Sequence, residues 1–515
     1  MNNFQTIRNL LLIGVASAAL AGCGGADDIA SPGEGVVVIP APPPTATPTP
    51  TPPPTATGPA TSCPAGTTDA GVIAERRNCR LPSLISSSLS LRQLAGTIYS
   101  MDGRVDVGVD VGGAGTAPGG QSALLSIDPG VVIFGNTQAT FLVINRGSQM
   151  SAEGTATNPI VFTSRQNVEG TATDGSDNQW GGVLLMGRAP ISNCRDAVAG
   201  GSVNCQQTAE GTGTSVFYGG ASPTDNSGTL RYVQLRYTGF SLAPNSELQA
   251  LTTGGVGSGT RIEFIQAHNS GDDGIEIFGG THNMKNVVIT GADDDTLDTD
   301  FGYKGAIQFL IGVQRPQSIK ANGGDAMIEA DSPAEVPGAA DFTPRQNTRL
   351  ANFTFVQTRT GRSAIHLRGG TDYALLNGVV VGPTNCLDVD EAATVQATGT
   401  DEAGPPIIRS VVFSCPTFAD PDADDFENVT ITASGNVGNN GAFTSTLANV
   451  FNNGSNEAAV PPVANLASLN AFFVTTSYIG AVRDANDTWY RGWTCDSSYA
   501  NFGSNRSCLA IPSAA

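Results

Sequence analysis

Acidic side chains crowd one stretch of this sequence, between Asn269 and Asp300. Seven of its 32 residues are Asp and one is Glu, in a chain in which 14% of the residues are charged. Carboxylates suit calcium, which takes about six to eight oxygen ligands, but the string DDDTLDTD does not have the spacing of an EF-hand loop. Two interpretations stay open: a calcium site, or solvated carboxylates at the corners of a regular fold. The candidate calcium ligands are Asp293, Asp294, Asp295, Asp298 and Asp300.

Paired carboxylates could also perform acid/base catalysis. A glycosidase holds two carboxyl groups roughly 5 to 9.5 Å apart, which two neighbouring copies of an acidic turn could supply. If the protein is an enzyme, the candidate catalytic residues are Asp272, Asp273, Asp294, Asp295 and Lys304. The histidines His268, His282 and His366 lack zinc-motif spacing and are expected to be polar residues of the fold rather than ligands.

The acidic stretch is internally repeated. DDGIE at 272–276 recurs as DDTLD at 294–298, an offset of 22, and more loosely as DAMIE at 325–329. An offset of this size is typical of a parallel β-solenoid, in which each coil stacks on the previous one. If Ile275 and Ile277 point inward, Glu276 points outward. Asp298, Glu329 and His366 take the equivalent positions on later coils.

Stacked coils bring equivalent carboxylates to within roughly 4.8 Å of one another, where like charges repel. Something must compensate this repulsion. The candidates are water and salt, a bound divalent cation, or one of the nearby basic residues Lys285, Lys304 and Arg368.

The elements that must position these side chains are short strands. From about Arg92 onward, apolar strand-like pieces alternate with Gly, Asn, Asp and Ser, and almost nothing has a helical period. We therefore predict an all-β solenoid over 96–470 with roughly fifteen to seventeen coils. Its exposed ends need covers, for which we assign an N-terminal cap to 63–95 and a C-terminal cap with a disulfide to 471–515.

Several long strings resemble one protein family. GRVDVGVDVGG, SIDPGVVIFG, the acidic repeat and YIGAVRDANDTWYRGWT are similar to exported bacterial lipoproteins with a right-handed parallel β-helix of the pectin-lyase type. That family is largely without assigned activity, and its members often occur beside outer-membrane transport receptors. β-Helices of this type also include polysaccharide lyases and glycosidases, so the resemblance implies an enzyme as an alternative. A lyase would use calcium with Lys304 or Arg368. The polygalacturonase motif set is incomplete, because no NTD precedes GDD and GTHN replaces the glycine-flanked histidine.

The N-terminus predicts export. Residues 1–22 have one charge, Arg8, before an apolar run and small residues, and this order is typical of a signal peptide. The string LAGC resembles a lipobox, which makes Cys23 the expected lipidation site and the outer membrane the expected location. Residues 23–62, rich in Pro and Thr, are expected to form an extended linker.

The number and spacing of the cysteines agree with an exported protein. Nine cysteines less Cys23 leave eight, which fall into sequence-local couples and read as disulfides. Eight cysteines allow 105 connectivities, so the sequence does not fix the pairing. The couples are Cys63 with Cys79, Cys194 with Cys205, Cys386 with Cys415, and Cys495 with Cys508.

A formal charge of −20 disfavours nucleic acid as a partner and favours cations or a basic surface. These features predict a non-enzymatic outer-membrane lipoprotein that is displayed at the cell surface, on a linker that holds the body away from the lipid. Its acidic solenoid would bind a receptor or a glycan, with calcium as the only expected cofactor. The alternative is an extracellular lyase or glycoside hydrolase that acts on acidic glycans.

Overall fold

The computed structural model describes residues 58–243, 246–317, 325–332, 342–421 and 426–513. The expected signal peptide, Cys23 and most of the 23–62 linker lie outside the described residues. Among the described residues, no helix is long and apolar enough to cross a membrane.

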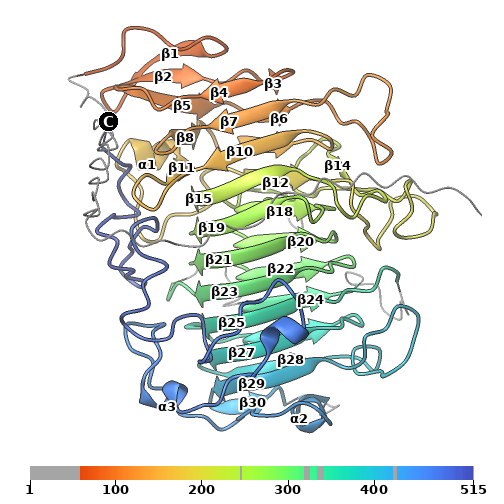
Figure 1. Ribbon diagram of the computed structural model, residues 1–515. Helices are drawn as coiled ribbons and strands as arrows, with labels where there is room; N and C mark the ends of the chain where they lie inside the picture. Colours follow the sequence, from red (N-terminus) through yellow and green to blue (C-terminus); the bar gives the residue numbers. More distant parts are fainter. Residues whose placement is uncertain (1–57, 244–245, 318–324, 333–341, 422–425, 514–515) are drawn as a thin grey trace, which may run out of the picture. The chain divides into compact units, whose positions relative to one another are not determined.

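The described chain is a stack of β-coils in which parallel strands pair with the next coil (Figure 1). One sheet, sheet B, contains a single short strand from each coil. Its order is β3 (Leu84–Ile85), β6 (Arg104–Val107), β9 (Phe141–Ile144), β12 (Gly182–Met186), β18 (Leu251–Gly254), β20 (Ile275–Phe278), β22 (Leu297–Asp300), β24 (Ile328–Asp331), β26 (Ile365–Arg368), β28 (Asn385–Val389) and β30 (Thr417–Ala419).

The larger sheet, sheet A, contains the remaining strands of the coils. Its main order is β1 (Thr68–Ile73), β2 (Arg76–Arg80), β5 (Thr97–Met101), β8 (Val132–Gly135), β11 (Ile160–Ser164), β15 (Gly228–Arg236), β19 (Arg261–His268), β21 (Asn283–Thr290), β23 (Ala306–Val313), β25 (Arg349–Val356), β27 (Ala374–Val381) and β29 (Ile407–Ser414). A side branch consists of β4 (Leu89–Leu91), β7 (Leu124–Ile127) and β10 (Gln149–Glu153), which joins β15.

Each long strand of sheet A turns a corner at one residue. β15 pairs with β10 through residues 228–231 and with β11 through residues 233–235, and Tyr232 between them has φ 53°. The pairing skips the equivalent residue on each later coil, so every coil has three faces. These residues all have left-handed backbone conformations, which Asn adopts more readily than most side chains. They are Tyr232, Phe264, Asn286, Phe309, Asn352, Asn377 and Ser410.

The interior is filled by rows of aliphatic side chains in register. Ile275, Leu297, Ile328, Ile365 and Leu387 follow one another on successive strands of sheet B, and all are fully buried. Such rows bury apolar area continuously along the stack, which is the main source of stability for a solenoid. The predicted fold class is therefore confirmed.

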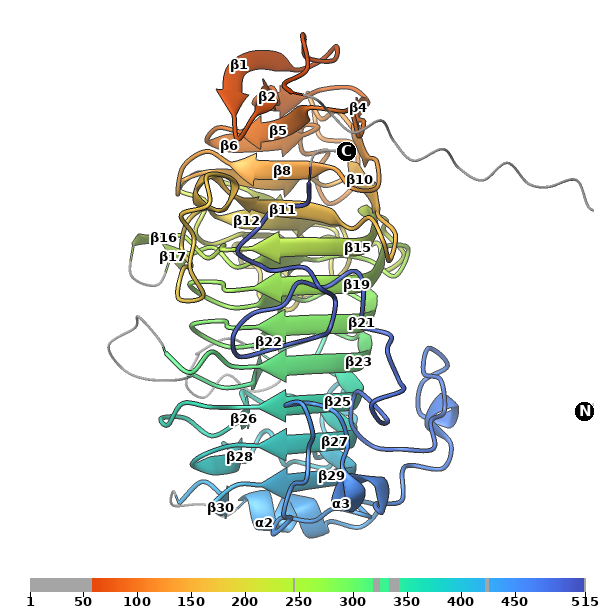
Figure 2. The same cartoon turned by 90° about the vertical axis from the view of Figure 1, so that its left-hand side faces the viewer.

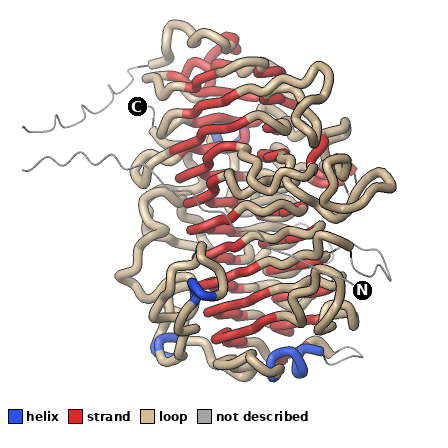
Figure 3. Tube along the Cα trace, turned by 45° about the vertical axis from the view of Figure 1, so that its right-hand side comes forward, coloured by secondary structure: helices blue, strands red, loops and turns tan. Residues whose placement is uncertain are grey.

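The expected number of coils is wrong. In the described residues, sheet B has eleven strands, one for each coil, whereas fifteen to seventeen coils were expected. The number is smaller because long loops interrupt the repeat, most clearly between β12 and β18. That loop carries the short hairpins β13 (Gln207–Thr208) with β14 (Phe217–Tyr218) and β16 (Ser241–Ala243) with β17 (Ser246–Glu247). Figure 3 shows such loops between the stacked strands.

The boundaries of the solenoid also differ from the expected ones. Parallel pairing already begins between β2 and β5, within the segment assigned to the N-terminal cap, whereas β1 is antiparallel to β2. Strands end at Ala419, and α2 (Phe426–Thr432) then packs against β28 and β29. The other short helices are α1 (Arg165–Val168), α3 (Ser455–Ala458) and the 3-10 turn Leu466–Ser468.

Residues 471–513 do not cap the open end, contrary to expectation. They run back along the outer face of sheet A towards the first coils (Figure 2). Gln308 and Gln266 hold this strap through hydrogen bonds to the backbone of Val474 and Cys495, and Trp493 packs edge-on against Phe264. The reason is that the outer face of sheet A offers amides and aromatic rings that need covering, which a strap provides over many coils.

All four sequence-local cysteine couples are disulfides, which confirms that prediction. The pairs are Cys63–Cys79, Cys194–Cys205, Cys386–Cys415 and Cys495–Cys508.

Candidate cation-binding face

The outward row predicted from the repeat is present on sheet B. Glu276 pairs in register with Asp298, Asp298 with Glu329, and Glu329 with His366, which is followed by Asp388. On earlier coils the same row holds Val143 and Leu184, which pack in one cluster with Cys205. Asp106 precedes them, and Thr252 follows them directly before Glu276. The row is therefore mixed on the earlier coils and continuously acidic from Glu276 to Glu329.

A second outward row lies two residues further along each strand. It runs from Phe278 to Asp300, and later from Asp331 to Arg368. We call these two rows, together with the corner residues Asp273, Asp294 and Asp295, the acidic face.

Most carboxylates of the acidic face, including the corner residues Asp273 and Asp295, are buried, whereas Asp294 and Glu329 are half-buried. This burial argues against solvated corner acids, one of the two interpretations of the sequence. Glu276, Asp298 and Asp300 are only 6%, 9% and 5% exposed. Part of the cover comes from a loop that is distant in sequence, since Gln249 Nε2 donates to Glu210 Oε1 at 2.7 Å and to Asp272 Oδ2 at 3.4 Å.

Three of these carboxylates have an oxygen without a partner. Glu276 Oε2, Asp298 Oδ1 and Asp300 Oδ1 are shielded from solvent and accept no hydrogen bond from the described residues. Burial, followed by the charge of Glu210, raises the pKa of Glu276 well above its usual range. Burial and then Asp300 do the same to the pKa of Asp298. Arg368 partly offsets the like charges around Asp300, whereas no basic side chain of the described residues does so for Glu276 or Asp298.

Corner residues link one coil to the next. Asp273 Oδ1 accepts a hydrogen bond from the backbone N–H of Asp295 at 2.8 Å, and Asp295 Oδ1 accepts one from the backbone N–H of Ala326. These corner aspartates therefore accept hydrogen bonds from the backbone of the next coil.

Oxygen atoms of the acidic face converge in three overlapping groups, within each of which the ligand atoms lie within 4.8 Å of one another. Asp273, Asp295 and Asp298 each belong to two groups, so the three groups form one continuous cluster. The groups are Asp273 with Asp294 and Asp295; Asp273 with Glu276 and Asp298; and Asp295 with Asp298 and Glu329.

Among the described residues, basic side chains pair with the acidic face at one of its ends. Arg368 Nη2 lies 3.0 Å from both Glu329 Oε1 and Asp331 Oδ2. Arg368 is therefore one of the compensating residues, as proposed from the sequence. Lys285 instead lies 4.8 Å from the ring of Phe472.

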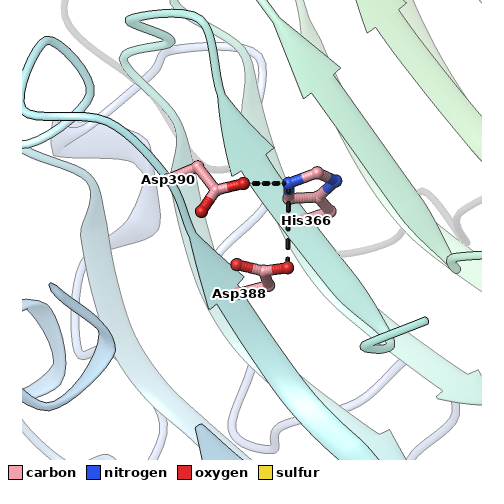
Figure 4. Close-up of side chains that lie close together, drawn as sticks. All are labelled: His366, Asp388 and Asp390. Carbon is pink, nitrogen blue, oxygen red and sulfur yellow. Dashed lines mark hydrogen bonds and ion pairs between the residues drawn. The ribbon is translucent and has the colours of Figure 1, made fainter. Parts of the chain in front are cut away.

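His366 supplies a second positive charge at this end. Its Nε2 lies 2.9 Å from Asp390 Oδ2 and 3.7 Å from Asp388 Oδ2 (Figure 4), and its Nδ1 lies 3.4 Å from Glu329 Oε1. Burial disfavours the charged ring, but the hydrogen bonds to Asp390 and Glu329 outweigh it and raise the pKa of His366 to about 9. The imidazolium thus occupies a position where a cation would otherwise be needed.

Asp293 does not belong to the acidic face, although its type and position suggested a calcium ligand. Its Oδ1 accepts from Arg315 Nη2 at 2.9 Å and from Arg359 Nη1 at 2.8 Å. Two arginines therefore neutralise this aspartate. Of the five candidate ligands, Asp294, Asp295 and Asp298 meet in the cluster, and Asp300 lies in the second row.

The candidate catalytic residues are only partly brought together. Asp273, Asp294 and Asp295 converge within 4.8 Å, closer than the roughly 5 to 9.5 Å between glycosidase carboxyl groups. Asp272 contacts Gln249, and Lys304 forms an ion pair with Asp401 at 2.6 Å. This geometry fits the binding of one positive charge better than two separate acid and base roles.

Sequence reasoning missed four residues of this region: Asp331, Asp388, Asp390 and Glu210. The first three could have been found by extending the outward alternation to IEAD and CLDVD. Glu210 could not, because it lies in a loop outside the repeat.

The stacked sheets define a right-handed parallel β-helix with an acidic outer face. Residues 115–494 match the family model of the pectate-lyase-like β-helix domain, and the chain belongs to this family. Comparisons with curated proteins and with solved structures return no match. Because one fold hosts many functions, the function must be argued from the acidic face.

Proposed function

We propose that the protein is a non-enzymatic β-helical scaffold whose acidic face binds a divalent cation of the calcium type. The observation that carries the proposal is the set of buried carboxylate oxygens without a partner, Glu276 Oε2, Asp298 Oδ1 and Asp300 Oδ1. A buried charge is costly unless it is paired or coordinates a metal.

The donor set suits a hard cation. Calcium binds about six to eight oxygens in flexible geometry, and the cluster offers carboxylates from six residues. The ion would be bound by Asp273, Glu276, Asp295 and Asp298. The carboxylates of Asp294 and Glu329 would lie next to it. The ion would supply the positive charge that Arg368 and His366 supply at the other end of the face.

Calcium titration of the full chain, followed by thermal unfolding, tests this proposal. Calcium should raise the melting temperature of the wild type and of Glu153→Gln, an exposed acid on β10 that serves as the matched control. The gain should be largely lost in Glu276→Gln. An equal gain in all three proteins would count against the acidic face as the site.

We also propose that lipid on Cys23 anchors the scaffold to the outer membrane, with the Pro/Thr-rich linker as a spacer. The partner would be an outer-membrane receptor or a glycan that binds through the cation or the acidic surface. In cell fractionation, Cys23→Ala should move the protein out of the membrane fraction, and complete retention would contradict the anchor. Protease treatment of intact cells would tell whether the body faces outward.

The second candidate is an acidic-glycan lyase or hydrolase, which one observation favours. Asp295 and Glu329 are hydrogen-bonded, yet burial raises the pKa of Asp295 while His366 and Asp295 bring the pKa of Glu329 down to about 2 despite its burial. Carboxylates with separated pKa values are typical of acid/base pairs. Reproducible cleavage of uronate polymers that is lost in Asp294→Asn would establish this function in place of the first.

A further inference from the structure

A second polar site lies on sheet A, away from the acidic face. It is a cavity of about 340 Å³ between the end of β15 and the C-terminal strap. No acidic residue lines it, although the chain has 46 acidic residues and 26 basic ones. Its lining includes Arg236, Ser504, Arg506 and Ser507.

Arg236 is the unusual residue of this cavity. It is 1% exposed, and its Nη1 donates to the backbone oxygens of Cys508 at 3.1 Å and Ala510 at 2.9 Å. Its Nε, at 2.9 Å, and its Nη2 both donate to Gln234 Oε1, so one N–H of Nη2 remains for a ligand. All of these acceptors are neutral. Among the described residues, no carboxylate forms an ion pair with Arg236.

Other fully buried arginines differ in this respect. Arg146 pairs with Asp110, Arg315 with Asp177, and Arg345 with Asp372. Because a buried charge without a counter-charge is unfavourable, the neutral surroundings of Arg236 leave room for a negative charge that the described protein does not supply.

Arg506 adds a second positive charge at the cavity. Its Nε donates to the backbone oxygen of Gly492 at 2.9 Å, and its Nη2 donates to that of Thr157. Its Nη1 has no acceptor in the described part of the chain. A guanidinium with free N–H groups matches the geometry of carboxylate, sulfate and phosphate oxygens.

We propose that this cavity binds a small oxyanion between Arg236 and Arg506, either as a free ion or as the acidic group of a larger ligand. The volume is at the lower end of ordinary ligand pockets, which hold roughly 300 to 1,000 Å³. The site would place an anion on sheet A, independent of the cation on sheet B.

The test uses the full chain in chelator, with sulfate or acetate replacing chloride at constant ionic strength. Sulfate stabilises many proteins without a specific site, so each variant is compared with wild type. Arg491→Gln is the matched control, because Arg491 belongs to the same strap but does not line the cavity. Wild type and control should show the same rise in melting temperature and the same binding isotherm by calorimetry.

Arg506→Gln should abolish the binding isotherm, and it should reduce the rise in melting temperature to the nonspecific effect of sulfate. Because Arg506 also fastens the strap, Ser507→Asp provides a second variant: Ser507 is exposed at the cavity, and Asp would bring its own carboxylate. Ser507→Asp should melt higher without added anion and no longer respond to sulfate. Unchanged sulfate binding in both variants, or no binding to wild type, would overturn the proposal. A response to sulfate but not acetate would indicate a tetrahedral rather than a carboxylate ligand.

Discussion

The substitution Asp298→Asn should have opposite effects on stability with and without calcium. Asp298 is 9% exposed, its Oδ1 has no partner among the described residues, and Asp300 and Asp273 add like charge to its surroundings. In chelator at pH 8, the amide needs neither a buried charge nor a proton taken up from solvent, so the variant should be more stable than the wild type. In calcium, the variant lacks a ligand and should lose the advantage.

The size of the effect follows from linkage. A cation at 100 times its dissociation constant stabilises the native state by about 2.7 kcal/mol. Unfolding roughly 450 residues at about 2.1 cal/mol/K per residue gives an entropy near 0.95 kcal/mol/K, so the wild type should gain about 3 °C in calcium. Removing the buried charge should be worth about 1 to 3 kcal/mol in chelator, or about 1 to 3 °C.

Scanning calorimetry of wild type, Asp298→Asn and Glu153→Gln, each in chelator and in calcium, measures both effects. The control should follow the wild type in both buffers. The reasoning is refuted if Asp298→Asn melts below the wild type in chelator and still gains the full 3 °C in calcium.

Three further outcomes are expected. Arg368→Gln should lower stability by about 1 to 3 kcal/mol by thermal unfolding, because Glu329 and Asp331 lose their shared partner, and full stability in the variant would contradict this role. In chelator, the melting temperature should fall as pH rises from about 5 to 9. The pKa of Asp331 is raised to about 7 and that of His366 to about 9, so the folded state binds these protons more tightly and loses their contribution as they leave. Calcium should weaken this trend, and a melting temperature that rises with pH would contradict it. Cys508→Ser should cost about 3 kcal/mol, since the bond closes a short loop, and should expose the strap to limited proteolysis; an unchanged cleavage pattern would show that the strap does not depend on it.

The sequence was sufficient for the fold class and for the register of the row that runs from Glu276 to His366. The offset of 22 between DDGIE and DDTLD is the pairing of Glu276 with Asp298, because a solenoid converts a local repeat into a spatial neighbour. The disulfides joined sequence-local couples for the same reason: the chain returns to nearly the same place after one coil or one loop.

The sequence could not predict the contacts that lie outside the repeat. Asp293 meets Arg359, 66 residues away, and this ion pair replaces the expected role in a cation site. The burial of the acidic face depends partly on the loop of Glu210, and the strap reaches Gln266 from Cys495, 229 residues later. Neither the loop nor the strap belongs to the repeat, so the repeat carries no information about where they lie.

The most direct test of the central claim is anomalous diffraction from crystals of the full chain grown in calcium. The proposal predicts an anomalous peak among the carboxylate oxygens of Asp273, Glu276, Asp295 and Asp298, and its loss in Asp298→Asn crystals. A wild-type map at saturating calcium without a peak at the acidic face would contradict the account.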